Sequence, residues 1–356
     1  MNSTILTPAE VFPAGEYLRD ELDARGWSDI EFAQIIARPP QAVSEIINGK
    51  KEITAETAVA IADALGTSAE LWLGLQTAYR LRQVRAGRPT VNSITRLAAL
   101  RSTVPLRELR RRGWIANTED PDVLESGVRD FLAPLSEPGF LAAARKTDAG
   151  LPFTPEQSAW IARVLKLGQG KKVRSFSQSR LEDLASELPR LVQSPEQLAL
   201  IGAKLAKCGV VLVIEPQLAG SKLDGVALLS ANGTRMVGLT TRGDRFDGFM
   251  FTLLHELAHI VLGHLETTGL RIDEGNDDAP ESDIEQQANE RASNWIFPDG
   301  FSPPPAPISI AAVRRLASKH GVHPSIVIGR LQRDDVLDWS QFRRSIPKVR
   351  LALGIS

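Results

Sequence analysis

The chain has 356 residues, more than one hydrophobic core usually supports, so its length predicts roughly two or three domains. Hydrophobic residues make up 43% and charged residues 24%, as in soluble globular proteins, and no run of about 18 apolar residues offers a membrane span. The single cysteine, Cys208, excludes an intrachain disulfide, and we therefore expect a cytoplasmic protein.

Residues 8–80 predict a compact all-α domain. Apolar residues recur at helical spacing along this stretch, and turn signals such as Asn48-Gly49 separate one helix from the next. Ser28, followed three residues later by Glu31, has the pattern of a capping box and marks the start of a helix.

Within this domain, residues 30–50 have the rhythm of a helix–turn–helix, whose second helix enters the major groove of DNA. We expect Val43, Ile46 and Ile47 to face the core. The predicted DNA contacts are the outward side chains of the second helix and the lysines after it, namely Gln41, Ser44, Glu45, Asn48, Lys50 and Lys51. The expected partner is operator DNA, bound by a dimer because half-sites come in pairs.

Charge is distributed unevenly over this part of the chain. Residues 1–75 hold 5 basic and 12 acidic side chains, a net of −7, whereas residues 76–112 hold 10 arginines and one acid, a net of +9. Two interpretations stay open. Either the arginines supply the phosphate contacts that an acidic module lacks, or they neutralise that module within the chain. The arginines in question are Arg80, Arg82, Arg85 and Arg88.

The remaining chain predicts four further segments. An arginine-rich connector covers 81–104, and an irregular helical region with no evident chemistry covers 105–195. A domain over 196–300 begins with short β-branched runs that predict a small strand meander before its main helix. A helical extension over 301–356 follows three prolines.

The most specific chemical pattern is H-E-x-x-H at residues 255–259. His255 and His259 are four residues apart, so a helix presents both imidazoles on one face, where they can hold one Zn²⁺. Glu256 is placed to take a proton from a zinc-bound water, which makes it the predicted catalytic base.

A catalytic zinc needs a third protein ligand. We favour Glu285, because Asn289 lies one helical turn further on and can hold a histidine ligand from behind. His264 and the acids from Asp277 to Asp283 are the alternatives. If His264 is not a ligand, it supports the site from behind the ligands or polarises a carbonyl.

These residues carry a resemblance to a known family. Residues 251–259, 285–298 and 313–331 together resemble the ImmA/IrrE family of zinc metallopeptidases, although Arg291-Ala292 and Phe297 depart from its usual helical motif. The resemblance implies a zincin-like α+β domain with a small sheet, Glu285 as the third zinc ligand, and cleavage of a helix–turn–helix repressor.

Residues 8–80 are similar to HigA-type antitoxins of the XRE class, except that Arg38-Pro39-Pro40 replaces the usual lead into the second helix and removes its N-cap oxygen. We therefore expect a multidomain, mostly α protein: a regulator of toxin–antitoxin or stress-response type that cleaves a partner repressor, an antitoxin or itself. The alternative is a HigA-like repressor whose peptidase fold senses metal or docks a toxin without cleaving.

Overall fold

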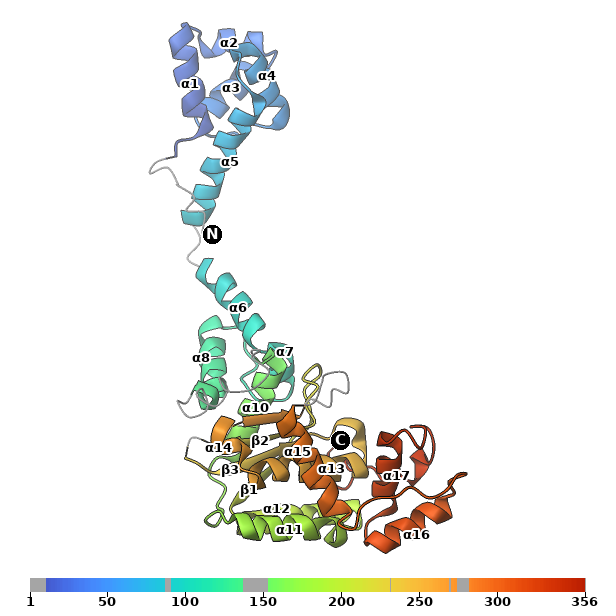
Figure 1. The fold of residues 1–356 in the computed structure, drawn as a ribbon. Helices are drawn as coiled ribbons and strands as arrows, with labels where there is room; N and C mark the ends of the chain where they lie inside the picture. Colours follow the sequence, from blue (N-terminus) through green and yellow to red (C-terminus); the bar gives the residue numbers. More distant parts are fainter. Residues whose placement is uncertain are drawn as a thin grey trace. The chain divides into compact units, whose positions relative to one another are not determined.

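The computed structural model describes residues 11–86, 91–136, 153–230, 232–268, 270–273 and 282–355. It divides into two compact units, Met1–Thr95 and Arg96–Ser356, which are described separately below (Figure 1). The fold is mostly helical with one small mixed sheet, as the sequence predicted. Among the described helices, none combines the length and the apolar character needed to cross a membrane.

The N-terminal unit is built from short helices around one core. Its elements are α1 (Ala14–Arg25), α2 (Asp29–Ile35), α3 (Pro40–Ile47), α4 (Ala55–Leu65) and α5 (Ala69–Ala86). The capping box is confirmed, since the Ser28 hydroxyl accepts from the Glu31 amide and the Glu31 carboxylate accepts from the Ser28 amide. Phe32, Ile61 and Trp72 are almost fully buried and centre the core.

Gly15 lets the backbone of α1 pack directly against the backbone of α3. A Cβ atom at Gly15 would lie 2.0 Å from the Ile46 carbonyl oxygen and 2.8 Å from that of Ile47. Both atoms belong to the backbone of α3, so neither can move without shifting that helix. The missing side chain at Gly15 therefore fixes how α3 is seated.

The second unit starts within α6 (Val91–Thr103) and surrounds a four-stranded sheet. Its helices are α7 (Leu106–Arg111), α8 (Pro121–Leu132), α10 (Pro155–Gly168), α11 (Gln178–Leu191), α12 (Ile201–Cys208), α13 (Phe246–Val261), α14 (His264–Thr268), α15 (Asp283–Ile296), α16 (Ile310–His320) and α17 (Pro324–Arg333). Its strands are β1 (Val210–Ile214), β2 (Gly225–Leu229), β3 (Arg235–Leu239) and β4 (Leu270–Asp273).

The expected strand meander is wrong in its topology. The strand order is β1-β3-β2-β4, with β1 parallel to β3 and the two pairs that contain β2 antiparallel. Strand β3 therefore lies between β1 and β2. The segment that joins β1 to β2 leaves a gap one strand wide in the sheet, and β3 fills that gap. Strand β4 was not foreseen, and it follows the main helix instead of preceding it.

Both faces of the sheet are covered by helices. Alternate residues such as Val210, Ala227 and Val237 pack on the core that contains α11, α12 and α13. Their neighbours in sequence, such as Val226 and Met236, pack on the opposite core with α10. Figure 1 shows the sheet between α10 on one side and α11 with α12 on the other.

The helices of residues 105–195 belong to this same unit. Trp160 of α10 is fully buried, and its indole N–H donates to the Glu215 carbonyl at the end of β1. Arg112, just after α7, donates to the carbonyls of Pro216 and Gln217 at 2.8 and 2.6 Å. Helices α7, α8 and α10 of this region thus close one face of the sheet that supports α13, and α11 packs on the other.

We predict that Gly15→Ala weakens the N-terminal unit by about 1–3 kcal/mol, because the added methyl overpacks against α3 backbone that cannot yield. Hydrogen exchange of the full chain, followed by mass spectrometry, should show faster exchange in α3. Gly74→Ala is the matched control, since Gly74 lies in α5 with open space on the side where a methyl would point, and exchange there should not accelerate. Equal exchange in both variants would contradict the role given to Gly15.

Candidate functional sites

The second helix of the helix–turn–helix presents the expected faces. Val43, Ile46 and Ile47 are buried, as predicted. Gln41 and Asn48 are exposed on α3 and at its end, and Ser44 and Glu45 are half-buried. The expected loss of an N-cap oxygen is confirmed, because Pro39 occupies the cap and offers no side-chain hydrogen bond; Pro40 at the first helical position suits the helix start instead.

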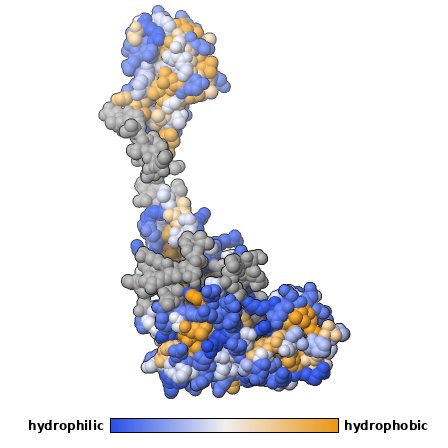
Figure 2. Space-filling view, viewed as in Figure 1, coloured by the Kyte–Doolittle hydropathy of each residue, from blue (hydrophilic) through white to orange (hydrophobic). Residues whose placement is uncertain are grey.

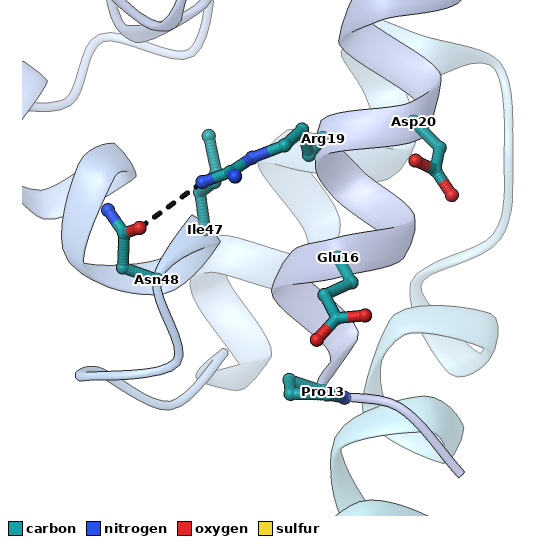
Figure 3. A pocket seen from close by; sticks show the side chains of 6 residues that line it. All are labelled: Pro13, Glu16, Arg19, Asp20, Ile47 and Asn48. Atoms are coloured by element: carbon teal, nitrogen blue, oxygen red, sulfur yellow. Dashed lines mark hydrogen bonds between the residues drawn. The ribbon is translucent and has the colours of Figure 1, made fainter. Parts of the chain in front are cut away.

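Two of the predicted base-reading side chains are already engaged within the unit. The Gln41 amide donates to the Glu45 carboxylate at 3.1 Å. The Asn48 oxygen accepts from Arg19 at 3.2 Å, and its amide donates to the Ser44 carbonyl at 2.8 Å. Figure 3 shows Arg19 reaching from α1 to Asn48 across a surface pocket lined by Pro13, Glu16, Arg19, Asp20, Ile47 and Asn48. Direct reading of a base by Asn48 therefore competes with its contacts to Arg19 and Ser44.

The basic side chains near α3 differ in their surroundings. Lys50 and Lys51 are exposed directly after the second helix. Arg80 of α5 forms an ion pair with Glu52 at 3.2 Å, as expected if arginines neutralise the acidic module within the chain. Arg88 lies outside the described residues.

The second site lies where α13 packs against α15. His255, Glu256 and His259 of α13 are buried, and Glu285 lies in the first turn of α15. Ligand atoms of His255, His259 and Glu285 all lie within 4.8 Å of one another. Asp283 is exposed, and Asp277 to Glu281 lie outside the described residues.

The three ligand atoms are close to the separations that a tetrahedral metal demands. The Nε2 atoms of His255 and His259 are 3.0 Å apart. Glu285 Oε2 lies 3.0 Å from His255 Nε2 and 3.4 Å from His259 Nε2. Ligands about 2.0–2.1 Å from a tetrahedral zinc are roughly 3.3 Å apart. The three distances in the structure therefore differ from this value by at most about 0.3 Å.

The outer ring nitrogens make hydrogen bonds that fix each imidazole. His255 Nδ1 lies 2.9 Å from Asn289 Oδ1, which accepts its proton. His259 Nδ1 lies 2.9 Å from His264 Nδ1, and His264 Nε2 lies 3.4 Å from Gln287 Oε1. Because Gln287 Oε1 only accepts, His264 donates there and accepts from His259. His264 thus lies behind His259, on the side away from Glu285.

These hydrogen bonds point the remaining lone pairs at a common centre. A neutral imidazole carries one N–H, and each histidine ligand uses it on its Nδ1 side, so both Nε2 atoms are acceptors. Together with the Glu285 carboxylate they form a cluster of three acceptors. Such a cluster fits a cation, and its nitrogen and carboxylate ligands suit zinc.

The charge states favour the same conclusion. Burial lowers the pKa of His259 to about 4, so its ring is neutral near pH 7. Burial alone would raise the pKa of Glu285, but its position beside the His255 and His259 rings outweighs burial and lowers that pKa. A neutral imidazole and an ionised carboxylate are the forms that bind a metal ion.

Helix α15 is held in place by contacts that the sequence did not reveal. Ala288 and Ala292 are fully buried, and their small side chains let α15 approach its neighbours. Arg291 and Trp295 both donate to the Glu182 carboxylate of α11, at 2.8 and 3.3 Å. Arg291 therefore anchors the helix that carries Glu285. Only the E-x-x-A-N spacing signalled which face of α15 looks inward.

Comparison with known proteins concerns the N-terminal unit. Residues 18–72 match the helix-turn-helix family HTH_3. Virulence-associated protein I of Dichelobacter nodosus is 34% identical over 85 residues, which are 24% of this chain and 79% of that protein. The uncharacterized HTH-type transcriptional regulator YddM of Escherichia coli (strain K12) is 32% identical over 69 residues, 19% of this chain and 73% of that protein.

Among solved structures, Pseudomonas aeruginosa antitoxin HigA with higBA promoter is 29% identical over 22% of this chain and 85% of that chain, with a TM-score of 0.21. The N-terminal unit is a helix–turn–helix domain, the class of fold that places its second helix in the DNA major groove. Through this domain the chain belongs to the helix-turn-helix family.

We predict that the purified chain binds about one Zn²⁺ per molecule and that Glu285→Gln and His259→Ala each abolish this binding, because two remaining ligands hold zinc poorly. Elemental analysis after dialysis measures the stoichiometry. Glu290→Gln is the matched control, since Glu290 is an exposed acid on the same helix and its loss should leave the zinc content unchanged. Zinc retained in Glu285→Gln would remove Glu285 from the site.

Proposed function

We propose that this chain is a DNA-binding transcriptional regulator with a zinc metallopeptidase centre that cleaves a regulatory protein. The observation that carries the proposal is the convergence of His255, His259 and Glu285 around one point, with Glu256 adjacent in sequence, in a chain that also holds a helix–turn–helix domain. The two parts of the proposal rest on different residues and are tested separately.

The DNA-binding part rests on the family of the N-terminal domain and on its exposed polar residues. Gln41 and half-buried Ser44 lie on the outer side of α3, and Lys50 and Lys51 follow it where phosphates would be contacted. YddM, which is similar over this domain, is described as a transcriptional regulator. We infer that operator DNA is the partner of this chain.

We infer that the chain binds its operator as a dimer, because paired half-sites are read by paired domains. Apolar side chains at the surface of the N-terminal unit offer contact area for a second copy (Figure 2). The large exposed ones are Phe12, Ile30, Ile35, Val59, Leu71, Leu81 and Val84.

In the peptidase part, His255, His259 and Glu285 would hold Zn²⁺, and Asn289 and His264 would hold the two imidazoles from behind. Zinc bound there would polarise the substrate carbonyl and supply a water that ionises near neutral pH. The Glu256 carboxylate would take up a proton as the peptide is attacked and pass it to the leaving amine of the cleaved peptide. A buried carboxylate suits this exchange, because its surroundings exclude competing water.

The substrate we propose is a partner repressor, an antitoxin or a second copy of this chain. A peptidase fused to an operator-binding domain is concentrated where such regulators act. In the alternative function the same ligands sense metal or dock a toxin without turnover. The two functions differ at Glu256, which cleavage requires and metal binding does not.

We predict that Glu256→Gln retains zinc but loses cleavage of the regulatory substrate by at least about 10²-fold, since the amide cannot accept the proton. Cleavage is measured with the zinc-loaded full chain against candidate repressors and against itself, and in cells by the disappearance of the partner. Glu290→Gln should cleave like the wild type. A wild-type chain that binds zinc and cleaves none of these proteins would leave the non-cleaving alternative.

We predict that Gln41→Ala/Ser44→Ala weakens binding to operator DNA about 10- to 100-fold, through loss of base contacts. The operator is first selected from random duplexes with the wild-type chain, and affinity is measured on the selected and a scrambled duplex at one salt concentration. Affinity for the scrambled duplex should not change. Thr77→Ala, a neutral change on α5, is the control. Unchanged sequence preference in the double variant would contradict the assignment of α3 as the reading helix.

A further inference from the structure

Gly225 occupies a position where glycine is not required by the backbone. It starts β2, its φ angle is not in the left-handed region, and it pairs with Leu239 on one side and Asp273 on the other. Glycine in a strand interior weakens the sheet and marks a place where other atoms approach closely. The reason for glycine must therefore lie in the atoms that approach this residue.

The approaching atoms belong to α13, at Glu256 itself and one turn before it. A Cβ atom at Gly225 would lie 2.5 Å from Glu256 Oε1, 2.9 Å from Glu256 Cγ and 2.8 Å from Thr252 Cγ2. The nearest atom is the end of the carboxylate. A glycine at the start of β2 thus leaves the space that this carboxylate fills.

Neither backbone can give way to relieve such a contact. Strand β2 is interior, with β3 and β4 hydrogen-bonded on its two sides. Helix α13 is buried along most of its length between the sheet, α11, α15 and α17. Of the three nearest atoms, Glu256 Oε1 is the closest and ends the longest and most flexible side chain, so a methyl at residue 225 would displace the carboxylate before it shifted either backbone.

We propose that Gly225 is a positioning residue that holds the Glu256 carboxylate beside the metal ligands. This inference rests on the proposed zinc centre. A carboxylate displaced by about 1 Å from its working place loses its hydrogen bond to a metal-bound ligand, and misplacements of that size can cost about 10²-fold in rate. The atoms nearest to residue 225 belong to Glu256 and Thr252, so the three metal ligands should bind metal as before.

The test uses the full chain loaded with Co²⁺, whose visible absorption reports ligand binding, and acetohydroxamic acid as the probe. The hydroxamate would chelate the metal and lose a proton to the Glu256 carboxylate. The protonated Glu256 side chain would then donate a charge-assisted hydrogen bond to the bound hydroxamate. Glu256→Gln should therefore weaken hydroxamate binding about tenfold, the size of one such bond. Gly225→Ala should weaken it by a similar factor, with Co²⁺ stoichiometry and melting temperature near the wild-type values.

Further variants separate this role from a structural one. Gly248→Ala is the matched control, because Gly248 lies on the same helix as Glu256 with open space where a methyl would point, and it should bind hydroxamate like the wild type. Thr252→Ser removes the methyl that a residue-225 side chain would also meet. If the effect passes through Glu256, the double variant Gly225→Ala/Thr252→Ser should bind hydroxamate as weakly as Gly225→Ala does. In a chain that already carries Glu256→Gln, adding Gly225→Ala should cause no further loss of hydroxamate affinity.

The possible outcomes are distinct. Hydroxamate affinity in Gly225→Ala equal to the wild type overturns the inference while the metal centre stands. Loss of Co²⁺, a large drop in melting temperature, or rescue by Thr252→Ser also overturns it, because each shows that Gly225 serves packing instead of the carboxylate. A wild-type chain that binds no Co²⁺ overturns the proposed metal centre, and this inference with it.

Discussion

The candidate centre depends on the packing of α15 against α13. Two histidines one turn apart offer two candidate ligands, and a third is available only because α15 lies close enough for Glu285 to face both rings. Fully buried Ala288 and Ala292 allow that approach. Arg291 and Trp295 then fasten α15 to Glu182 of α11. The ligand set is therefore a property of three helices and not of the H-E-x-x-H segment alone.

The sheet also contacts α13, the helix that carries His255, Glu256 and His259. Because β2 lies between β3 and β4, its start is fixed in space, and Gly225 meets the carboxylate next to the first histidine ligand. The opposite face of the sheet is closed by α10 and by the helices around Arg112. Helices α7, α8 and α10 thus bury the back of the sheet, whereas α11, from the same stretch of sequence, packs on the face that carries α13.

The helix–turn–helix domain shows how internal contacts can limit recognition. Gln41 and Asn48 are the residues best suited by chemistry to read adenine, yet each is hydrogen-bonded within the domain. A DNA complex must exchange these bonds for contacts with bases, so the net gain per contact is smaller than a free side chain would provide. Exposed Lys50 and Lys51 carry no such cost.

The sequence by itself determined features that arise from neighbours along the chain. These include the helix–turn–helix, the Ser28–Glu31 capping box, the buried face of α3 and the common face of His255 and His259, since helical periodicity and capping act over three to four residues. The choice of Glu285 came from local spacing on α15 together with the family resemblance. Only the tertiary structure decided the strand order, the unforeseen strand β4, the role of Arg291, the place of His264 behind His259, and the contact between Gly225 and Glu256. Each of these depends on segments far apart in sequence, whose relative positions are fixed by packing and leave no periodic signal in the chain.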